Sequence, residues 1–158
     1  MIILGVDPGS RATGYGVIDT APVARLLGGG VIRPAPGAPL GERLRDIHQG
    51  LAGAIAEFNP EVVVVERVFQ ARNPHSALVL GHARGVVLLA AAQAGLTPVE
   101  YTAREIKLAV AGTGAAGKEQ VRFMVMRLLR LGAEPPLDLS DALAAALAHQ
   151  GRARQAVG

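Results

Sequence analysis

The segment Ile2–Asp7, IILGVD, constrains the fold more than any other part of the chain. A run of aliphatic residues with no polar face is typical of a strand that is buried on both sides, as in the centre of an α/β sheet. The strand ends in Asp7, and Pro8 and Gly9 then predict a turn. The carboxylate of Asp7 is therefore either part of that turn or a functional group at the edge of a sheet.

The rest of the chain predicts an α/β arrangement with a mixed sheet and helices packed on its faces. Further strands are expected over residues 14–18, 26–33, 61–66 and 97–101, and helices over 40–58, 76–94, 103–111, 118–131 and 139–150. The short spacing of the first three strands indicates antiparallel hairpins. We expect one domain over residues 1–150 and a flexible basic tail over 151–158.

Composition narrows the class of protein. A chain of 158 residues with 50% hydrophobic content suits one compact domain. It has no long uninterrupted apolar run and no basic-then-apolar N-terminal segment, so we expect neither a membrane span nor a signal peptide. The absence of cysteine excludes a disulfide framework and favours a cytoplasmic protein. The net charge of +3 is spread along the chain and says little about nucleic acid by itself.

Four carboxylates lie at the ends of predicted elements. Asp7 and Glu66 each end a strand, and they would emerge at one sheet edge if those strands are parallel neighbours. Asp138 and Asp141 lie near the start of the last helix, three residues apart, and so share a face. Each acid alone also fits a simple structural role as a turn residue, a solvated strand end or an acidic first turn of a helix.

Together the four acids indicate a metal site. Carboxylates held close together repel each other, and their pKa values rise unless cations neutralise them. Oxygen ligands without His or Cys suit Mg²⁺ or Mn²⁺. Two such ions can activate a water and stabilise the leaving oxygen in phosphodiester cleavage. The proximity of the four acids is an expectation from topology.

Several segments closely resemble one family, the bacterial RuvC Holliday junction resolvases, in register from Met1 to about His149. These segments are DPGSRATGYGVI, VVVVERVFQARNPHSALVLGHARG, EIKLAV, GKEQV and DLSDALAAALAH. The resemblance implies a ribonuclease-H-like fold with a five-stranded sheet, a homodimer, and four-way junction DNA as substrate. It further implies Mg²⁺-dependent paired nicking with two ions per active site, Mn²⁺ as a substitute, and action with RuvA and RuvB in a bacterial cytoplasm, at the nucleoid.

The resemblance also implies roles for individual residues. The family's metal ligands match Asp7, Glu66, Asp138 and Asp141. The basic residues near the scissile phosphate match Lys107 and Lys118. Phe69 matches an aromatic residue that probes bases near the crossover, although without the resemblance it is equally a core residue at a strand end. We add Arg72 and Arg104 as backbone contacts because both follow predicted strand ends. The candidate dimer interface is the helix over 76–94, with Leu78, Val79, Val86 and Val87.

Two other signals do not support a nucleotide site. GTGAAGKE, residues 112–119, lacks the Ser or Thr that a phosphate-binding P-loop needs after its lysine. DPGSRATGYG also resembles a phosphate loop of the actin-like sugar kinases, but those proteins need a second similar domain, for which the chain has no room. The histidines show no close metal spacing: His48, His75, His82 and His149.

Two alternative functions remain beside the junction endonuclease. The first is a structure-specific DNA-binding module without catalysis, against which the presence of all four acids argues. The second is a nuclease acting on RNA, like the YqgF-like proteins, which share an Asp-Pro-Gly opening. Phe69 and the region from Lys107 to Lys118 favour the junction enzyme over it.

Overall fold

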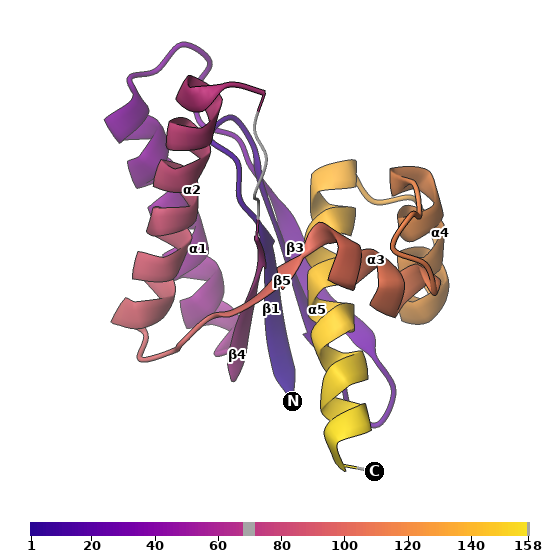
Figure 1. The fold of residues 1–158 in the computed structure, drawn as a ribbon. Coiled ribbons are helices and arrows are strands. Elements are labelled where there is room, and N and C mark those ends of the chain that lie inside the picture. The colour runs from indigo at the N-terminus through magenta and orange to yellow at the C-terminus, as the bar shows by residue number, and fades with distance from the viewer. Residues whose placement is uncertain (68–71, 158) are drawn as a thin grey trace.

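A computed structural model describes residues 1–67 and 72–157, and it shows a central sheet with helices on both faces (Figure 1). The strands are β1 (Ile2–Asp7), β2 (Thr13–Asp19), β3 (Arg25–Ile32), β4 (Val62–Arg67) and β5 (Val99–Thr102). The helices are α1 (Leu40–Phe58), α2 (Pro74–Gln93), α3 (Ala103–Ala111), α4 (Lys118–Leu129) and α5 (Leu137–Val157). The strand order is β3-β2-β1-β4-β5, which confirms the predicted mixed five-stranded sheet.

The position of β1 in the sheet explains its aliphatic sequence. β1 pairs antiparallel with β2 on one side and parallel with β4 on the other, with Val6 opposite Val65. It is therefore a central strand, and both of its faces are covered by helices. The parallel pairing brings Asp7 and Glu66, the residues that follow Val6 and Val65, to the same edge of the sheet, as expected.

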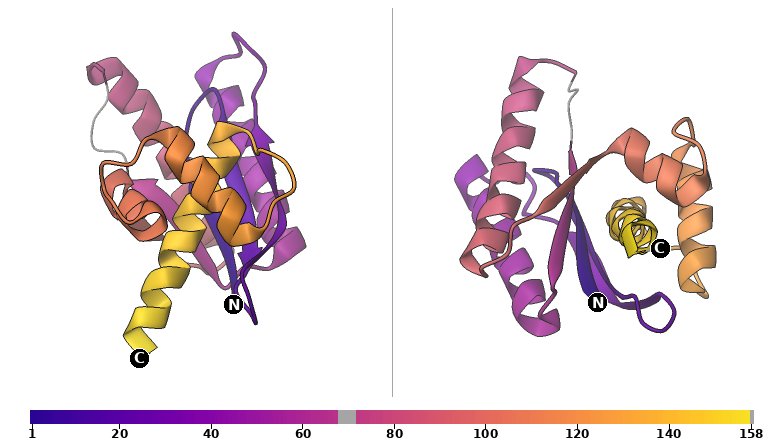
Figure 2. Two further views of the ribbon diagram at one scale, coloured as in Figure 1. Left: turned by 90° about the vertical axis from the view of Figure 1, so that its right-hand side faces the viewer. Right: turned by 60° about the horizontal axis from the view of Figure 1, so that its bottom comes forward.

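The helices form two layers. Figure 2 shows α1 and α2 together on one face of the sheet and α3, α4 and α5 on the other. The first layer packs Ile47 and Leu51 of α1 against Leu4 and Val6 of β1. The second layer packs mainly α5 against the opposite face of the same strands. The alternation of side chains along β1 divides its residues between the two cores.

Two glycines let α5 lie directly on the strands. A Cβ atom at Gly5 would collide with the carbonyl oxygen of Ala142, and one at Gly14 would collide with the carbonyl oxygen of Asp138. Both obstacles are backbone atoms, which cannot move aside without shifting the helix. Glycine at these positions therefore sets the height of the N-terminal half of α5 above β1 and β2, and with it the position of Asp138 and Asp141.

The last helix is longer than the sequence indicates. We expected it to end at Gln150, and this was wrong, because α5 continues to Val157. Its extension is tied to the body of the protein by Arg152. The guanidinium group of Arg152 lies 2.9 Å from a carboxylate oxygen of Glu105 and 4.7 Å from the ring centroid of Tyr101.

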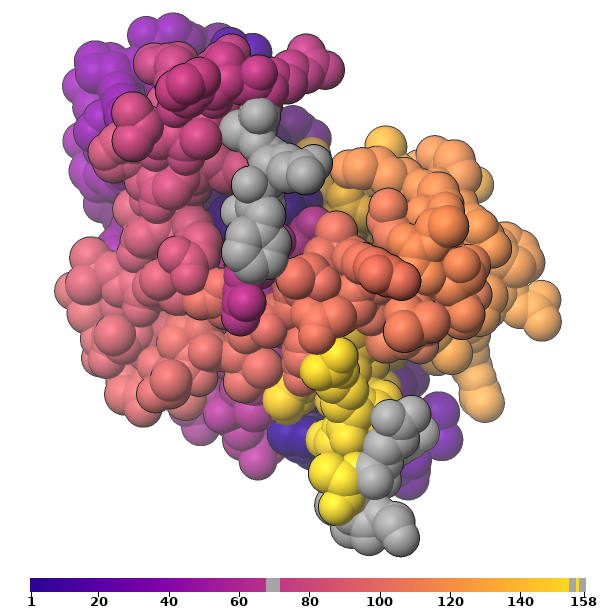
Figure 3. Space-filling view, viewed as in Figure 1, coloured from indigo at the N-terminus to yellow at the C-terminus, as the bar shows by residue number. Residues whose placement is uncertain are grey.

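The helix α2 is unusually apolar for a helix at the surface. Among the described helices it alone is long and apolar enough to cross a membrane by length and composition, although a core helix can pass the same test. Ala83, Val87 and Ala91 are buried within the protein, whereas Leu78 and Leu89 are exposed. The space-filling view shows α2 on the surface of the molecule (Figure 3).

A candidate active site at the edge of the sheet

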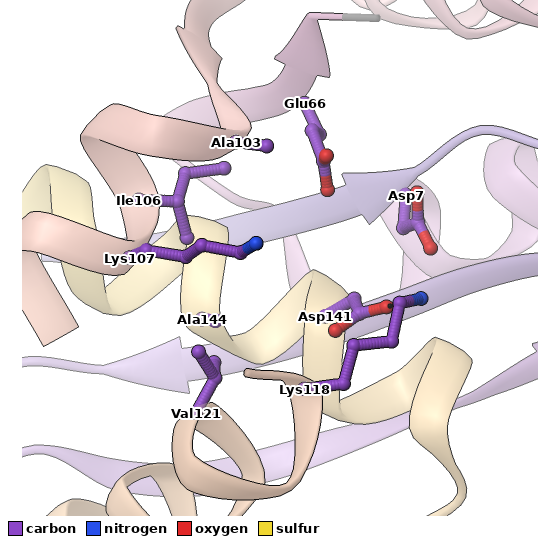
Figure 4. A pocket seen from close by; sticks show the side chains of 9 residues that line it. All are labelled: Asp7, Glu66, Ala103, Ile106, Lys107, Lys118, Val121, Asp141 and Ala144. Atoms are coloured by element: carbon purple, nitrogen blue, oxygen red, sulfur yellow. Dashed lines mark hydrogen bonds and ion pairs between the residues drawn. The ribbon is translucent and has the colours of Figure 1, made fainter. Parts of the chain in front are cut away.

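The ends of β1 and β4 form one wall of a pocket that collects acids and lysines (Figure 4). Asp7 comes from β1, Glu66 from β4 and Asp141 from the start of α5. Lys107 reaches the pocket from α3 and Lys118 from the first residue of α4. The remaining lining residues are Ala103, Ile106, Val121 and Ala144. Five charged residues that are distant in sequence thus converge at one edge of the sheet.

The pocket strongly disfavours negative charge on its acids. Burial, followed by repulsion from Glu66 and Asp141, raises the pKa of Asp7 to about 8. Burial, followed by repulsion from Asp141, also raises the pKa of Glu66. These directions are expected where carboxylates share a desolvated site. The acids therefore remain fully ionised together only when positive charge is brought to them.

Part of that positive charge comes from the two lysines. The ammonium nitrogen of Lys118 lies 2.9 Å from Oδ2 of Asp141, and this hydrogen bond is the main reason that the pKa of Lys118 is raised. Both Lys118 and Lys107 act against the increase in the pKa of Glu66. The lysines are thus charged groups that face the acids and any anion placed between them.

Asp138 lies beside the pocket. It is absent from the lining of the pocket, and its carboxylate is 3.7 Å from the guanidinium group of Arg33. Its charge nevertheless contributes, as the smallest of the named causes, to the raised pKa of Asp7. Asp138 as a metal ligand therefore stays a prediction, and Arg33 was not among the residues expected near the site. The available signal was that Arg33 directly follows β3, which runs parallel to β1 and ends at the same edge.

The other candidate residues have different locations. Arg72 and Arg104 are exposed, and neither lines the pocket. The side chain of Arg104 lies against Gly114 in the loop between α3 and α4. Phe69 falls outside the described residues, so its position relative to the site stays a prediction.

The donors in the pocket suit a hard cation but do not form a finished metal site. Within residues 1–67 and 72–157, no three Asp, Glu or His side chains are close enough to hold a metal ion as they stand. The group is nevertheless made of carboxylates alone, which are the ligands that Mg²⁺ and Mn²⁺ prefer. A divalent cation would compete with Lys118 for Asp141, and it would relieve the repulsion that raises the pKa of Asp7.

Comparisons with known proteins place the chain in one family. Residues 3–149 match the family model of the crossover junction endodeoxyribonuclease RuvC. The chain is 54% identical over 149 residues to RuvC of Pseudomonas putida strain W619, covering 94% of this chain and 85% of that protein. It is 53% identical over 147 residues to RuvC of Halorhodospira halophila, covering 93% and 88% of the two chains.

Solved structures agree with the sequence comparison. Thermus thermophilus RuvC in complex with a Holliday junction substrate matches with a TM-score of 0.93 and 41% identity, covering 99% of this chain and 96% of that one. The yeast mitochondrial Holliday junction resolvase Ydc2 matches with a TM-score of 0.66, 12% identity, and coverage of 97% and 80%, which is a likeness of fold alone. The predicted ribonuclease-H-like fold is confirmed. On the family model and these identities, the chain belongs to the RuvC family of crossover junction endodeoxyribonucleases.

Proposed function

We propose that this protein is a Holliday junction resolvase that makes paired symmetric nicks in four-way DNA junctions during homologous recombination and repair. The observation that carries the proposal is the match, over nearly the whole of both chains, to a RuvC structure that holds a Holliday junction substrate. The pocket of acids and lysines at the sheet edge supports it, because phosphodiester cleavage needs groups that stabilise the negative charge developing on the reacting phosphate. Neither the catalytically inactive module nor the RNA nuclease is favoured by the comparisons.

We assign metal binding to Asp7, Glu66, Asp138 and Asp141, with Mg²⁺ as the expected ion. Bound divalent cations supply an activated water and neutralise charge on the leaving oxygen. The raised pKa values of Asp7 and Glu66 support this assignment, because they reflect carboxylates that lack sufficient positive charge. Asp138 would have to exchange its 3.7 Å contact with Arg33 for the metal ion in order to serve as a ligand.

We assign Lys118 and Lys107 to the phosphate. Lys118 holds Asp141 in place through its hydrogen bond, and it is exposed enough to exchange that partner for a phosphate oxygen. Lys107 faces the same pocket from α3 and offsets charge near Glu66. Phe69 as a base-probing aromatic residue, and Arg72 and Arg104 as backbone contacts, complete the proposed DNA interface.

The expected partners follow from the substrate. A four-way junction has two equivalent strands to cut, so two active sites in a homodimer would nick it symmetrically. Cooperation with the branch-migration proteins RuvA and RuvB, and location at the nucleoid in the cytoplasm, belong to the same proposal.

Cleavage of a four-way junction with fixed arms and a mobile core, in Mg²⁺, tests the proposal. The wild-type protein is compared with Asp7→Asn, which keeps the size of the side chain but removes its charge. Asp46→Asn is the matched control, because Asp46 is paired with Arg45 on α1 and lies outside the pocket. We expect paired nicks from the wild type and the control, and none from Asp7→Asn, which still binds the junction.

Two results would contradict the proposal in different ways. Junction binding without nicks in either Mg²⁺ or Mn²⁺ would indicate a module without catalysis. Equal cleavage of junctions, linear duplexes and RNA would indicate a nuclease of broader specificity.

A further inference from the structure

A second hollow lies at the same edge of the sheet, on the side of α1. It is a groove of about 500 Å³ between the turn that follows β1 and the loop that leads from β3 to α1, which is the purple loop above α1 in Figure 1. It is lined by Arg11, Pro34, Ala35, Pro36, Gly37, Ala38 and Arg43, and shares no residue with the acidic pocket. Arg11 is four residues after Asp7, so their Cα atoms are at most about 14 Å apart.

The groove carries positive charge that no acid balances. Its lining holds two arginines and no carboxylate. Seven other arginines of the described residues form ion pairs, but neither Arg11 nor Arg43 lies within ion-pair distance of a described carboxylate. Arg43 has only a long contact of 3.4 Å from its Nη1 to the hydroxyl of Ser10, and its buried Nε has no hydrogen-bond partner among the described residues. An unsatisfied buried donor is unfavourable, and the guanidinium group of Arg43 thus has hydrogen-bonding capacity that the described residues do not use.

The turn that carries Arg11 is fixed in place. The Thr13 hydroxyl donates to the Gly9 carbonyl oxygen at 2.7 Å and accepts from the Gly9 N–H at 3.2 Å. Thr13 is fully buried, and a Cβ atom at Gly9 would collide with the carbonyl oxygen of Ala12. Ser10 and Arg11 are therefore presented at the tip of a rigid turn, so that little backbone freedom is lost when Arg11 binds a ligand.

The opposite wall adds a helix N-terminus. Pro39 is the N-cap residue of α1 and makes no side-chain capping bond. Arg43, whose guanidinium group lines the groove, lies in the first turn of the same helix. The free N–H groups of a helix N-terminus and the helix dipole favour an anion. The two arginines and the helix end thus favour an anion, against the single opposing charge of the exposed Glu42 in the same first turn.

We propose that this groove binds a phosphodiester group of the junction DNA, close to the phosphate that enters the acidic pocket. The inference rests on the proposed function and extends it to a second phosphate site. Arg11 and Arg43 are the ligands, because planar guanidinium groups can hold phosphate oxygens with paired hydrogen bonds. The rest of the lining is Pro, Ala and Gly, which has no side-chain donors to read base edges. The site therefore positions the backbone without regard to sequence.

The test measures affinity for a labelled four-way junction at several salt concentrations without divalent metal, together with the single-turnover nicking rate at saturating protein in Mg²⁺. The variants are Arg11→Gln, Arg43→Gln and the conservative Arg43→Lys. The control is Arg25→Gln, which removes the same charge at the opposite edge of the sheet, where Arg25 pairs with Asp19. The melting temperature of each variant shows whether it is folded.

We expect Arg11→Gln and Arg43→Gln each to weaken junction binding by about tenfold at low salt. Each lost phosphate contact should also make the plot of log affinity against log salt less steep by about 0.9. Arg43→Lys should keep the salt slope but recover only part of the affinity. The nicking rate at saturation should stay within about twofold of wild type, because the arginines hold the backbone and take no part in bond breaking.

Affinity and salt slope equal to those of Arg25→Gln would overturn the inference, and so would a loss of saturating rate with unchanged affinity. If Arg43→Gln fails to fold, Arg11→Gln still decides the matter, since Arg11 is exposed at the surface. The inference and the proposed function fail in different ways. If the proposed function is wrong, the wild-type protein itself will neither prefer nor nick junctions.

Discussion

At the scale of single residues, Asp7 lines the acidic pocket, a position that its sequence context does not require. Asp-Pro-Gly is a common turn sequence, so the acid could simply stabilise the turn. In the structure the hydrogen bonds that hold this turn run between Gly9 and Thr13. The carboxyl group of Asp7 instead points into the acidic pocket (Figure 4). The turn therefore does not account for an acid at this position.

The raised pKa of Asp7 predicts that metal binding releases a proton. With a pKa of about 8, this carboxyl group is about nine-tenths protonated at pH 7 in the metal-free protein, whereas a metal ligand must be ionised. Calorimetry of Mg²⁺ binding in two buffers with different heats of ionisation should show about one proton released per site. Affinity for Mg²⁺ should rise as the pH increases from 6 to 8 and then level off.

Asp46→Asn should leave this proton release unchanged, because Asp46 lies outside the pocket. Asp7→Asn should greatly reduce it, with any remaining release coming from Glu66, whose pKa is also raised. An affinity for Mg²⁺ that is constant between pH 6 and 8 would show that Asp7 is already ionised in the metal-free protein.

At the scale of elements, the contact between α5 and the strands controls the site. Gly14→Ala would place a methyl group against the carbonyl oxygen of Asp138 and push the first turn of α5 away from β2. We expect the free energy of unfolding to fall by about 1–3 kcal/mol. Because Asp138 and Asp141 would move with the helix, we expect junction cleavage to fall by about 100-fold.

Gly53→Ala is the matched control for that substitution. Gly53 is exposed within α1, and a Cβ atom there meets nothing within 4 Å. The substitution should raise stability by about 0.5–1 kcal/mol, since alanine is the better helix former, and leave cleavage unchanged. Denaturant unfolding and the nicking assay measure both effects. Normal cleavage by a folded Gly14→Ala protein would show that the site tolerates a shift of α5.

The elements also show what the sequence could and could not predict. The end of β1 at Asp7 was predictable because an aliphatic run marks a buried strand and a turn ends it, whereas β4 continues one residue beyond the expected end at Glu66, to Arg67. The C-terminal end of α5 was not, because Gly151 disfavours a helix locally by about 1 kcal/mol. The contacts of Arg152 with Glu105 and Tyr101 are tertiary and leave no local pattern. The third strand already indicated that Arg33 lies at the same edge of the sheet, but its contact with Asp138 is tertiary and leaves no local pattern.

At the scale of the whole molecule, we expect α2 to contact the second copy of the chain in the proposed homodimer. Its exposed apolar residues include Leu78, which is 66% exposed, and Leu89, which is 50% exposed. They border an apolar groove of about 530 Å³ on α2. Of the residues expected at the interface, Val87 was wrong, because it is only 2% exposed and packs inside the protein. The spacing of apolar residues along α2 did not distinguish the inner from the outer face, because both faces of this helix are apolar.

The double substitution Leu78→Arg and Leu89→Arg should therefore convert a dimer into a monomer, because it places charges in the apolar centre of the interface. Sedimentation velocity over a range of concentrations measures the change. In the cleavage assay, the two strands of one junction should no longer be nicked together. Leu108→Arg on α3 is the control, since Leu108 is 57% exposed on a different face. A double variant that still sediments as a dimer would place the interface elsewhere.

The wide spacing of the site residues along the chain has a consequence for the timing of activity during synthesis. Asp7 and Glu66 belong to strands made early, but Asp141 is supplied by the last helix, which covers β1 and β2 only after it has left the ribosome. A nascent chain that ends before residue 141 carries an incomplete set of acids. On the proposed assignment of the acids, such a chain would not cut DNA, and activity would begin only after α5 has packed on the sheet.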